Sequence, residues 1–266
     1  MKPKKNILLT NDDGFESSGI LALRDALKDI AQILIVAPAS EKSACGHGLT
    51  LTRPLSFVRI DDDFYKLEDG TPSDCVYLAL NALYKGDYKP DLIISGINLG
   101  SNMGEDITYS GTAAGAMEGC IQGIPSIAIS QIMSDKNRSE HFDFSLAKQS
   151  IRILVQSIFE KGYPLKGRKF LNVNIPHIPT DACKGFKITQ MGYRIYGDDA
   201  HLHRNPRGIE YYWLGLHPLR WQERIGTPFE GSDFLATHDG YISITPIKLD
   251  MTSYEDCASL AQWIDA

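Results

Sequence analysis

The first apolar run of the chain is Asn6-Ile-Leu-Leu-Thr10, and it passes directly into Asn11-Asp12-Asp13-Gly14. A short apolar run of this kind is typical of a strand that is buried on both faces of a sheet. From Gly19 onward, apolar residues recur every three or four positions, which predicts a helix behind that strand. A buried strand, a polar loop and an amphipathic helix together predict the first unit of a parallel α/β sheet.

The same alternation of strand and helix patterns continues through the first two thirds of the chain. Further strands are predicted at 33–37, 91–95, 125–130 and 170–175, and helices at 73–84, 111–122 and 147–160. Residues 56–60 and 64–67 flank three successive aspartates and predict a β-hairpin. We therefore expect an α/β fold with a mostly parallel sheet and helices on both of its faces.

After about residue 181 the composition shifts toward aromatic residues, turn residues and alternating strands. Strand patterns occur at 187–189, 209–214 and 240–245, and a last helix is expected over about 254–264. We divide the chain into an α/β core, 1–180, and a β-hairpin-rich extension with a C-terminal helix, 181–266. Its aromatic side chains either fold back on the core or contact a second subunit, and the residues leave both options open.

Composition and charge exclude several classes of protein. The 266 residues carry a formal net charge of −6, with 43% hydrophobic and 23% charged residues, which excludes wholesale disorder. An acidic chain without a basic block is a poor candidate for nucleic-acid binding. No apolar run approaches the roughly 18 residues that cross a bilayer. Five cysteines without a C-x-x-C pair fit reduced thiols, so we expect a cytoplasmic protein.

Three polar loops follow strands of the predicted sheet. The first is 11–14, the second is 38–48 with Ser43, and the third is 96–104 with Asn98 and Asn102. Ligands of an open parallel sheet bind at the carboxyl ends of its strands, so these loops should converge at one edge.

Asp12 and Asp13 stand next to each other at the end of the first strand. Two carboxylates in one cleft repel each other unless a cation neutralises them, and a hard divalent ion with oxygen ligands would do so. The alternative is that Asp12 caps the following turn and Asp13 faces solvent. The two further polar loops at the same edge favour the metal site.

A second candidate site is Tyr109-Ser110-Gly111-Thr112, which opens a helix of small residues. Free backbone N–H groups and two hydroxyls at the positive end of a helix suit a phosphate group. The alternative is plain capping by Ser110, with Gly115 and Gly119 allowing close packing of the helix. Neither a G-x-G-x-x-G, a P-loop nor a G-x-S-x-G motif is present, which excludes the enzyme classes that these motifs mark.

Taken in order, Asn11-Asp12-Asp13-Gly14, Ser43, Ser95-Gly-Ile-Asn98-Leu-Gly-Ser-Asn102 and Tyr109-Ser110-Gly111-Thr112 resemble the survival protein SurE family of metal-dependent 5′-nucleotidases. Residues 70–75 and 240–246 are also similar to that family. The resemblance spans nearly the whole chain, and the ordered set is far more specific than any single piece.

The resemblance implies a Rossmann-like core and hydrolysis of nucleoside monophosphates to nucleoside and phosphate, with 3′-nucleotidase or exopolyphosphatase activity as further options. It also implies a cytoplasmic homodimer or homotetramer that exchanges C-terminal segments, and one divalent ion: Mg, Mn or Ca. Carried over by position, the metal ligands are Asp12, Asp13, Ser43 and Asn98, the first two also being catalytic, and the phosphate-binding residues are Asn102, Ser110, Gly111 and Thr112. Two alternatives stay open: a nucleotide-binding protein without turnover, and a phosphatase that forms an aspartyl-phosphate.

Overall fold

The computed structural model describes residues 4–84, 88–133, 142–197, 199–215, 219–227 and 229–265. Within these residues, one large sheet has the strand order β3-β4-β2-β1-β5-β6-β7-β13-β8. Neighbouring strands are parallel except in the pairs β3–β4 and β7–β13, which confirms the predicted mostly parallel sheet. Its strands are β1 (Lys5–Thr10), β2 (Ala31–Pro38), β3 (Ser56–Asp61), β4 (Phe64–Glu68), β5 (Leu92–Leu99), β6 (Ser126–Gln131), β7 (Lys169–Ile175), β8 (Phe186–Ile188) and β13 (Ile242–Lys248).

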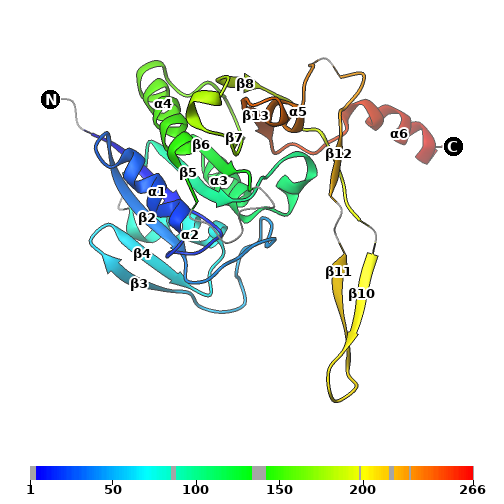
Figure 1. Cartoon of the computed structure of the whole chain (residues 1–266), viewed down its shortest axis with the longest axis horizontal. Coiled ribbons are helices and arrows are strands. Elements are labelled where there is room, and N and C mark those ends of the chain that lie inside the picture. Colours follow the sequence, from blue (N-terminus) through cyan, green and yellow to red (C-terminus); the bar gives the residue numbers. More distant parts are fainter. Residues whose placement is uncertain are drawn as a thin grey trace.

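Helices cover both faces of this sheet, as the sequence pattern predicts (Figure 1). Ile7 and Leu9 of β1 belong to one buried cluster with Leu23, whereas Leu8 belongs to a second cluster with Val76. Because successive side chains of a strand point to opposite faces, β1 fills both layers of the core. Helices α1 (Ser18–Leu27) and α4 (Ser145–Lys161) pack together on one face, and α2 (Pro72–Leu78) and α3 (Gly111–Ile121) pack together on the other.

Local side-chain hydrogen bonds set where α1, α2 and α3 begin. Ser17 accepts a hydrogen bond from the backbone N–H of Gly19 at the start of α1. Thr71 and Asp74 form a reciprocal capping box at the start of α2, and Ser110 caps α3. The helix predicted over 73–84 is α-helical only to Leu78 and continues as a π-helix, η1 (Ala79–Leu83).

The last third of the chain divides between the sheet and a projecting arm. Strands β8 and β13 extend the large sheet beyond β7, and α5 (Asp233–His238) packs beside β13. Strands β9 (Tyr193–Ile195) and β12 (Arg220–Gln222) pair antiparallel. Beyond them, β10 (Asp199–Arg204) and β11 (Glu210–Gly215) form a hairpin that extends away from the body (Figure 1). We call the elements β9 to β12 the arm; β9 and β12 form its base and the hairpin its tip. The division at residue 180/181 stays a prediction.

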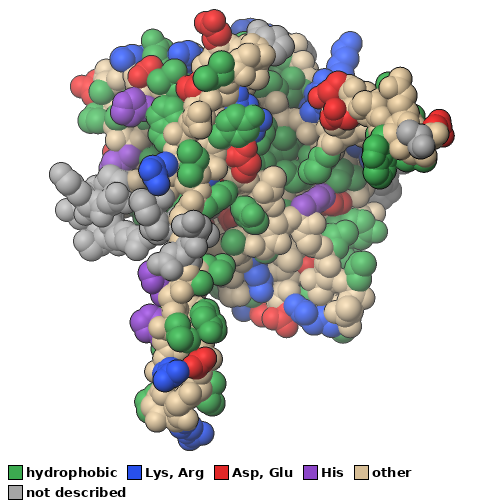
Figure 2. All heavy atoms as spheres, turned by 90° about the vertical axis from the view of Figure 1, so that its right-hand side faces the viewer, with side chains coloured by type: hydrophobic (Ala, Val, Ile, Leu, Met, Phe, Trp, Pro, Cys, Tyr) green, Lys and Arg blue, Asp and Glu red, His purple; other side chains and the backbone are tan. Residues whose placement is uncertain are grey.

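The arm carries large side chains that this chain does not cover. Tyr212 and Trp213 are 62% and 64% exposed, although neighbouring residues of a strand point to opposite faces. Both faces of the hairpin are therefore open. Helix α6 (Cys257–Asp265) likewise exposes Trp263, and Figure 2 shows hydrophobic side chains on the arm and on this helix. Among the described residues, no helix is both long and apolar enough to cross a membrane.

Helix α3 packs very closely on the sheet because two of its three glycines, Gly115 and Gly119, face the strands. A Cβ atom at Gly119 would lie 2.3 Å from Ser126 Oγ and 2.8 Å from Ile93 Cδ1. A Cβ atom at Gly115 would lie 2.8 Å from Ser95 Oγ. Such distances are far inside van der Waals contact, so the helix can sit at this depth only without those side chains.

We predict that Gly119→Ala lowers the free energy of unfolding by about 1–3 kcal/mol through overpacking. Helix propensity alone would favour alanine by roughly 0.5–1 kcal/mol, so the sign of the change distinguishes the two effects. Urea denaturation of both proteins measures it. A variant more stable than the wild type would contradict the packing described for α3.

Candidate metal and phosphate site

Three segments meet at the carboxyl end of β1, as the sequence predicts. The backbone N–H of Lys42, in the loop after β2, donates to the Asp12 carbonyl oxygen at 2.7 Å. The backbone N–H of Leu99, at the end of β5, donates to Asp13 Oδ2 at 3.2 Å. The backbone N–H of Thr112, in the first turn of α3, donates to Asp12 Oδ2 at 2.9 Å. The acidic pair is therefore the point where these segments join.

Asp12 is buried and both of its carboxylate oxygens face Thr112. Besides the backbone contact to Oδ2, the Thr112 hydroxyl donates to Asp12 Oδ1. Burial raises the pKa of the Asp12 carboxyl, and the hydrogen bonds from Thr112 oppose that rise. The positive end of the α3 dipole also favours an anion here.

Asp13 lies closer to solvent than Asp12 and feels its charge. Burial, then the neighbouring Asp12 and finally Glu41 raise the pKa of Asp13 to about 6, against the opposing effect of the hydrogen bond from Leu99. The repulsion that adjacency in sequence indicates is thus present in the fold. None of the ion pairs between described residues involves Asp12 or Asp13.

Ser43 and Asn98 lie on two of the three segments that contact the acidic pair. Ser43 Oγ donates to Glu41 Oε1 at 2.7 Å, one residue from the Lys42 contact to Asp12. Asn98 Nδ2 donates to the Gly100 carbonyl oxygen at 2.8 Å. Strand β5 runs on past the predicted end at residue 95, with a register shift between Ser95 and Asn98 that places Asn98 on the edge.

The donors in these four side chains are two carboxylates, one hydroxyl and one amide oxygen. An all-oxygen set with two negative charges fits a hard divalent cation and not a soft one. Within the described residues no cluster of three or more His, Cys, Asp or Glu side chains offers a competing metal site.

The predicted phosphate-binding residues fall into two groups. Ser110 Oγ accepts from the Ala113 N–H at 2.9 Å and caps α3, while Gly111 and Thr112 contact Asp12 directly. A Cβ atom at Gly111 would lie 2.7 Å from Asp12 Cβ, so glycine is required there.

Asn102 belongs to the second group, because its contacts are to β6 and β7 and not to Asp12. Its Nδ2 donates to Ser130 Oγ at 2.8 Å, and its backbone N–H donates to Asn174 Oδ1 at 2.9 Å. The Asn174 amide donates back to the Asn102 carbonyl oxygen at 3.0 Å. Asn102 therefore anchors the loop after β5 to the strands β6 and β7.

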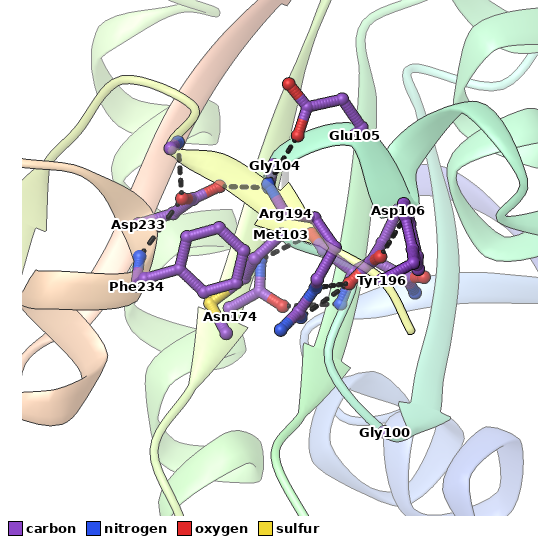
Figure 3. Close-up of polar contacts among 12 residues, drawn as sticks. Gly100, Met103, Gly104, Glu105, Asp106, Asn174, Arg194, Tyr196, Asp233 and Phe234 are labelled. Carbon is purple, nitrogen blue, oxygen red and sulfur yellow. Dashed lines mark hydrogen bonds and ion pairs between the residues drawn. The ribbon is translucent and has the colours of Figure 1, made fainter. Parts of the chain in front are cut away.

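Sequence reasoning missed contacts that hold the surrounding loops. Asp74 accepts from the backbone and hydroxyl of Thr50 at 2.9 and 2.7 Å, which fixes the loop after β2. The capping-box spacing of Thr71 and Asp74 was the local signal that this aspartate is structural. Arg194, which reaches the loop after β5 from far along the chain, has no such signal (Figure 3).

The fold defines a doubly wound α/β protein, and its candidate ligand site lies at the carboxyl edge of the sheet. The family profile described as Survival protein SurE matches residues 7–198. The chain belongs to the SurE family.

Similar proteins cover almost the whole chain. The 5′-nucleotidase SurE of Helicobacter hepaticus is 78% identical over 98% of this chain and 99% of its own length. The 5′-nucleotidase SurE of Wolinella succinogenes is 66% identical over 98% of this chain and 99% of its own length. The crystal structure of the SurE protein from Aquifex aeolicus matches with a TM-score of 0.80 and 41% identity, covering 98% of this chain and all of that one.

We predict that the Thr112 hydroxyl contributes to the stability of the fold through its hydrogen bond to Asp12. Thr112→Val is nearly isosteric but leaves an oxygen of a buried carboxylate without its donor, which should lower the free energy of unfolding by about 1–3 kcal/mol. Thr112→Ser keeps the donor and loses one buried methyl group, at a cost of about 1 kcal/mol. Denaturation of both metal-free variants measures the difference, and a valine variant as stable as the serine variant would refute the role given to the hydroxyl.

Proposed function

We propose that this protein is a metal-dependent 5′-nucleotidase that hydrolyses nucleoside monophosphates to nucleoside and phosphate. The observation that carries the proposal is the acidic pair, Asp12 and Asp13, placed against the N-terminus of α3. A cation site and a helix N-terminus side by side are what phosphoryl transfer needs, because charge on the phosphoryl oxygens must be shared. The names of the similar proteins, which cover nearly all of the chain, agree with this activity.

Asp12, Asp13, Ser43 and Asn98 would hold one divalent ion, Mg, Mn or Ca. The fit rests on the donor chemistry and on the raised pKa of Asp13, which burial causes first and the neighbouring charge of Asp12 second. When bound, such an ion supplies positive charge that polarises a phosphate oxygen and lowers the pKa of water.

The remaining chemistry comes from the residues of the chain. Ser110, Gly111 and Thr112 would place the N-terminus of α3 with its dipole, together with the Ser110 hydroxyl, against the phosphate. Asn102 would fix the loop on the other side of that phosphate through its buried hydrogen bonds. A carboxylate oxygen of Asp12 or Asp13 would accept the proton of the attacking water. Direct attack by Asp12 on phosphorus is less compatible with the hydrogen bonds from Thr112 to both of its oxygens.

The assembly and location of the protein are part of the same proposal. A hairpin with both faces open would bury Tyr212 and Trp213 only against a second copy, so we assign a homodimer or homotetramer. Free cysteines, all five of them within the described residues, suit the reducing cytoplasm.

Asp12→Asn should reduce phosphate release by about 10²-fold or more. The asparagine can keep both contacts to Thr112, because its amide can donate to the hydroxyl while its oxygen accepts from the backbone, so the fold should persist. Phosphate release from AMP and GMP with Mn²⁺ or Mg²⁺, with and without a chelator, is the measurement.

Asp29→Asn is the matched control, because Asp29 pairs with Arg152 at an exposed position far from the acidic pair. It should keep wild-type activity. Near wild-type turnover by Asp12→Asn at saturating metal, or full wild-type activity in chelator, would overturn the proposed function.

The pKa of Asp13 predicts how metal affinity depends on pH. The ordinary pKa of an aspartate is about 4, and the pKa of Asp13 in the metal-free protein is about 6. Below about pH 6 the ion competes with a proton, so Mn²⁺ affinity should fall about tenfold per pH unit as pH decreases. Above that value the dependence on this group should level off. Calorimetric titrations between about pH 5 and pH 8 measure it, and an affinity independent of pH would contradict the prediction.

A further inference from the structure

Three successive residues of the loop after β5 are tied to the last third of the chain. They begin the 3-10 helix η2 (Gly104–Thr108), which lies between Asn98 and Ser110 in the sequence. We call Gly104, Glu105 and Asp106 the 104–106 segment. Figure 3 shows Asp233, Arg194 and Tyr196 reaching this segment from other elements.

Asp233 and Arg194 together contact all three residues of the 104–106 segment. The Gly104 N–H donates to Asp233 Oδ2 at 2.8 Å, and Glu105 Oε2 accepts from the Arg194 backbone at 2.6 Å. The Arg194 guanidinium donates to Asp106 Oδ2 through Nε at 2.8 Å and through Nη2 at 2.6 Å. Two charge-assisted bonds to one carboxylate hold both groups in a defined orientation.

The guanidinium of Arg194 has little freedom to move. Its side chain is only 8% exposed, and its Cζ lies 4.4 Å from the centre of the Phe234 ring. Trp221, on the paired strand β12, stacks on the same phenylalanine at 5.7 Å. Packing against an aromatic face and burial together fix the position of the charge that Asp106 meets.

Asp106 transmits this position to the start of α3. Its carbonyl oxygen accepts from the backbone N–H groups of Tyr109 and Ser110, each at 3.1 Å. Ser110 in turn caps α3, whose next residues contact Asp12. One residue thus joins Arg194, through its side chain, to the proposed phosphate-binding turn, through its backbone.

Tyr196 adds a second link to the same residue. Its hydroxyl donates to Asp106 Oδ1 at 2.7 Å, so both carboxylate oxygens of Asp106 are engaged by β9 and the residue that follows it. The Tyr196 ring also meets the ring of Tyr109 edge-on, with centroids 6.1 Å apart. Tyr109 is exposed and directly precedes Ser110.

We propose that Arg194 is a positioning residue for the proposed phosphate-binding turn, acting through Asp106, so that the strand at the base of the arm sets the geometry of the active site. The proposal rests on the proposed function, because it gives that function's phosphate site its support. Loss of the guanidinium frees Asp106, and the Ser110–Thr112 turn then loses its fixed orientation toward the phosphate.

The test compares Arg194→Gln, Asp106→Asn and the double variant with the wild type. Steady-state hydrolysis of AMP with Mn²⁺, calorimetric binding of inorganic phosphate and of Mn²⁺, and thermal unfolding are measured for each protein. We expect each single variant to lose about 10–100-fold in kcat/KM and to bind phosphate about tenfold more weakly. Mn²⁺ affinity should stay within about twofold, and the double variant should be no worse than either single one, because both residues belong to one link.

Arg204→Gln is the matched control. Arg204 pairs with Glu210 at 2.6 Å in the same arm, but at an exposed position in the hairpin. It should keep wild-type hydrolysis and phosphate affinity. Wild-type values in Arg194→Gln, or additive losses in the double variant, would overturn the proposal.

A conservative variant keeps the test decisive if Arg194→Gln does not fold. Tyr196→Phe removes only the hydroxyl that reaches Asp106, and it should weaken phosphate binding about threefold or more; unchanged binding would overturn the proposal.

A wild type that binds phosphate but releases none from AMP would refute the proposed function. The difference in phosphate binding between Arg194→Gln and Arg204→Gln would still decide the role of Arg194.

Discussion

The contact between the Asp12 carboxylate and the first turn of α3 is the interaction on which the site depends. It joins the carboxyl end of β1 to the start of α3, which packs on the strands β5 and β6. The contact requires glycine at position 111, since any side chain there would collide with Asp12. It also requires α3 to lie deep against the sheet, which Gly115 and Gly119 allow. A buried anion, a helix N-terminus and three glycines are thus one arrangement, and each part would be unfavourable without the others.

Much of the sheet could be predicted from local patterns. Apolar runs separated by amphipathic helices identify parallel strands, and the topology then brings their carboxyl ends to one edge. This is why the meeting of Asp12, Asp13 and the loops that bear Ser43 and Asn98 was predictable. The extension of β5 to Leu99 was not, because a register shift has no signature in a run of polar and glycine residues.

The contacts that hold the loops of the site in place could not be predicted from the sequence. Arg194 and Asp106 are 88 residues apart, and nothing near either residue indicates the other. Asn102 carries the same polar side chain whether it faces a ligand or, as found, the buried hydroxyl of Ser130. Contacts of this kind depend on which segments the whole topology brings together, so only the folded structure reveals them.

The strand β13 pairs with β7 but is synthesised much later, so the sheet cannot be completed in the order in which its strands are made. Strand β7 is flanked by β6 on one side and by β13 on the other, although β13 is among the last segments of the chain. While the ribosome is still making the intervening arm, β7 therefore has an unpaired edge with free backbone donors and acceptors. Such an edge is where growing chains associate wrongly, and the polypeptide must keep it apart from other nascent copies until its own C-terminal strand emerges.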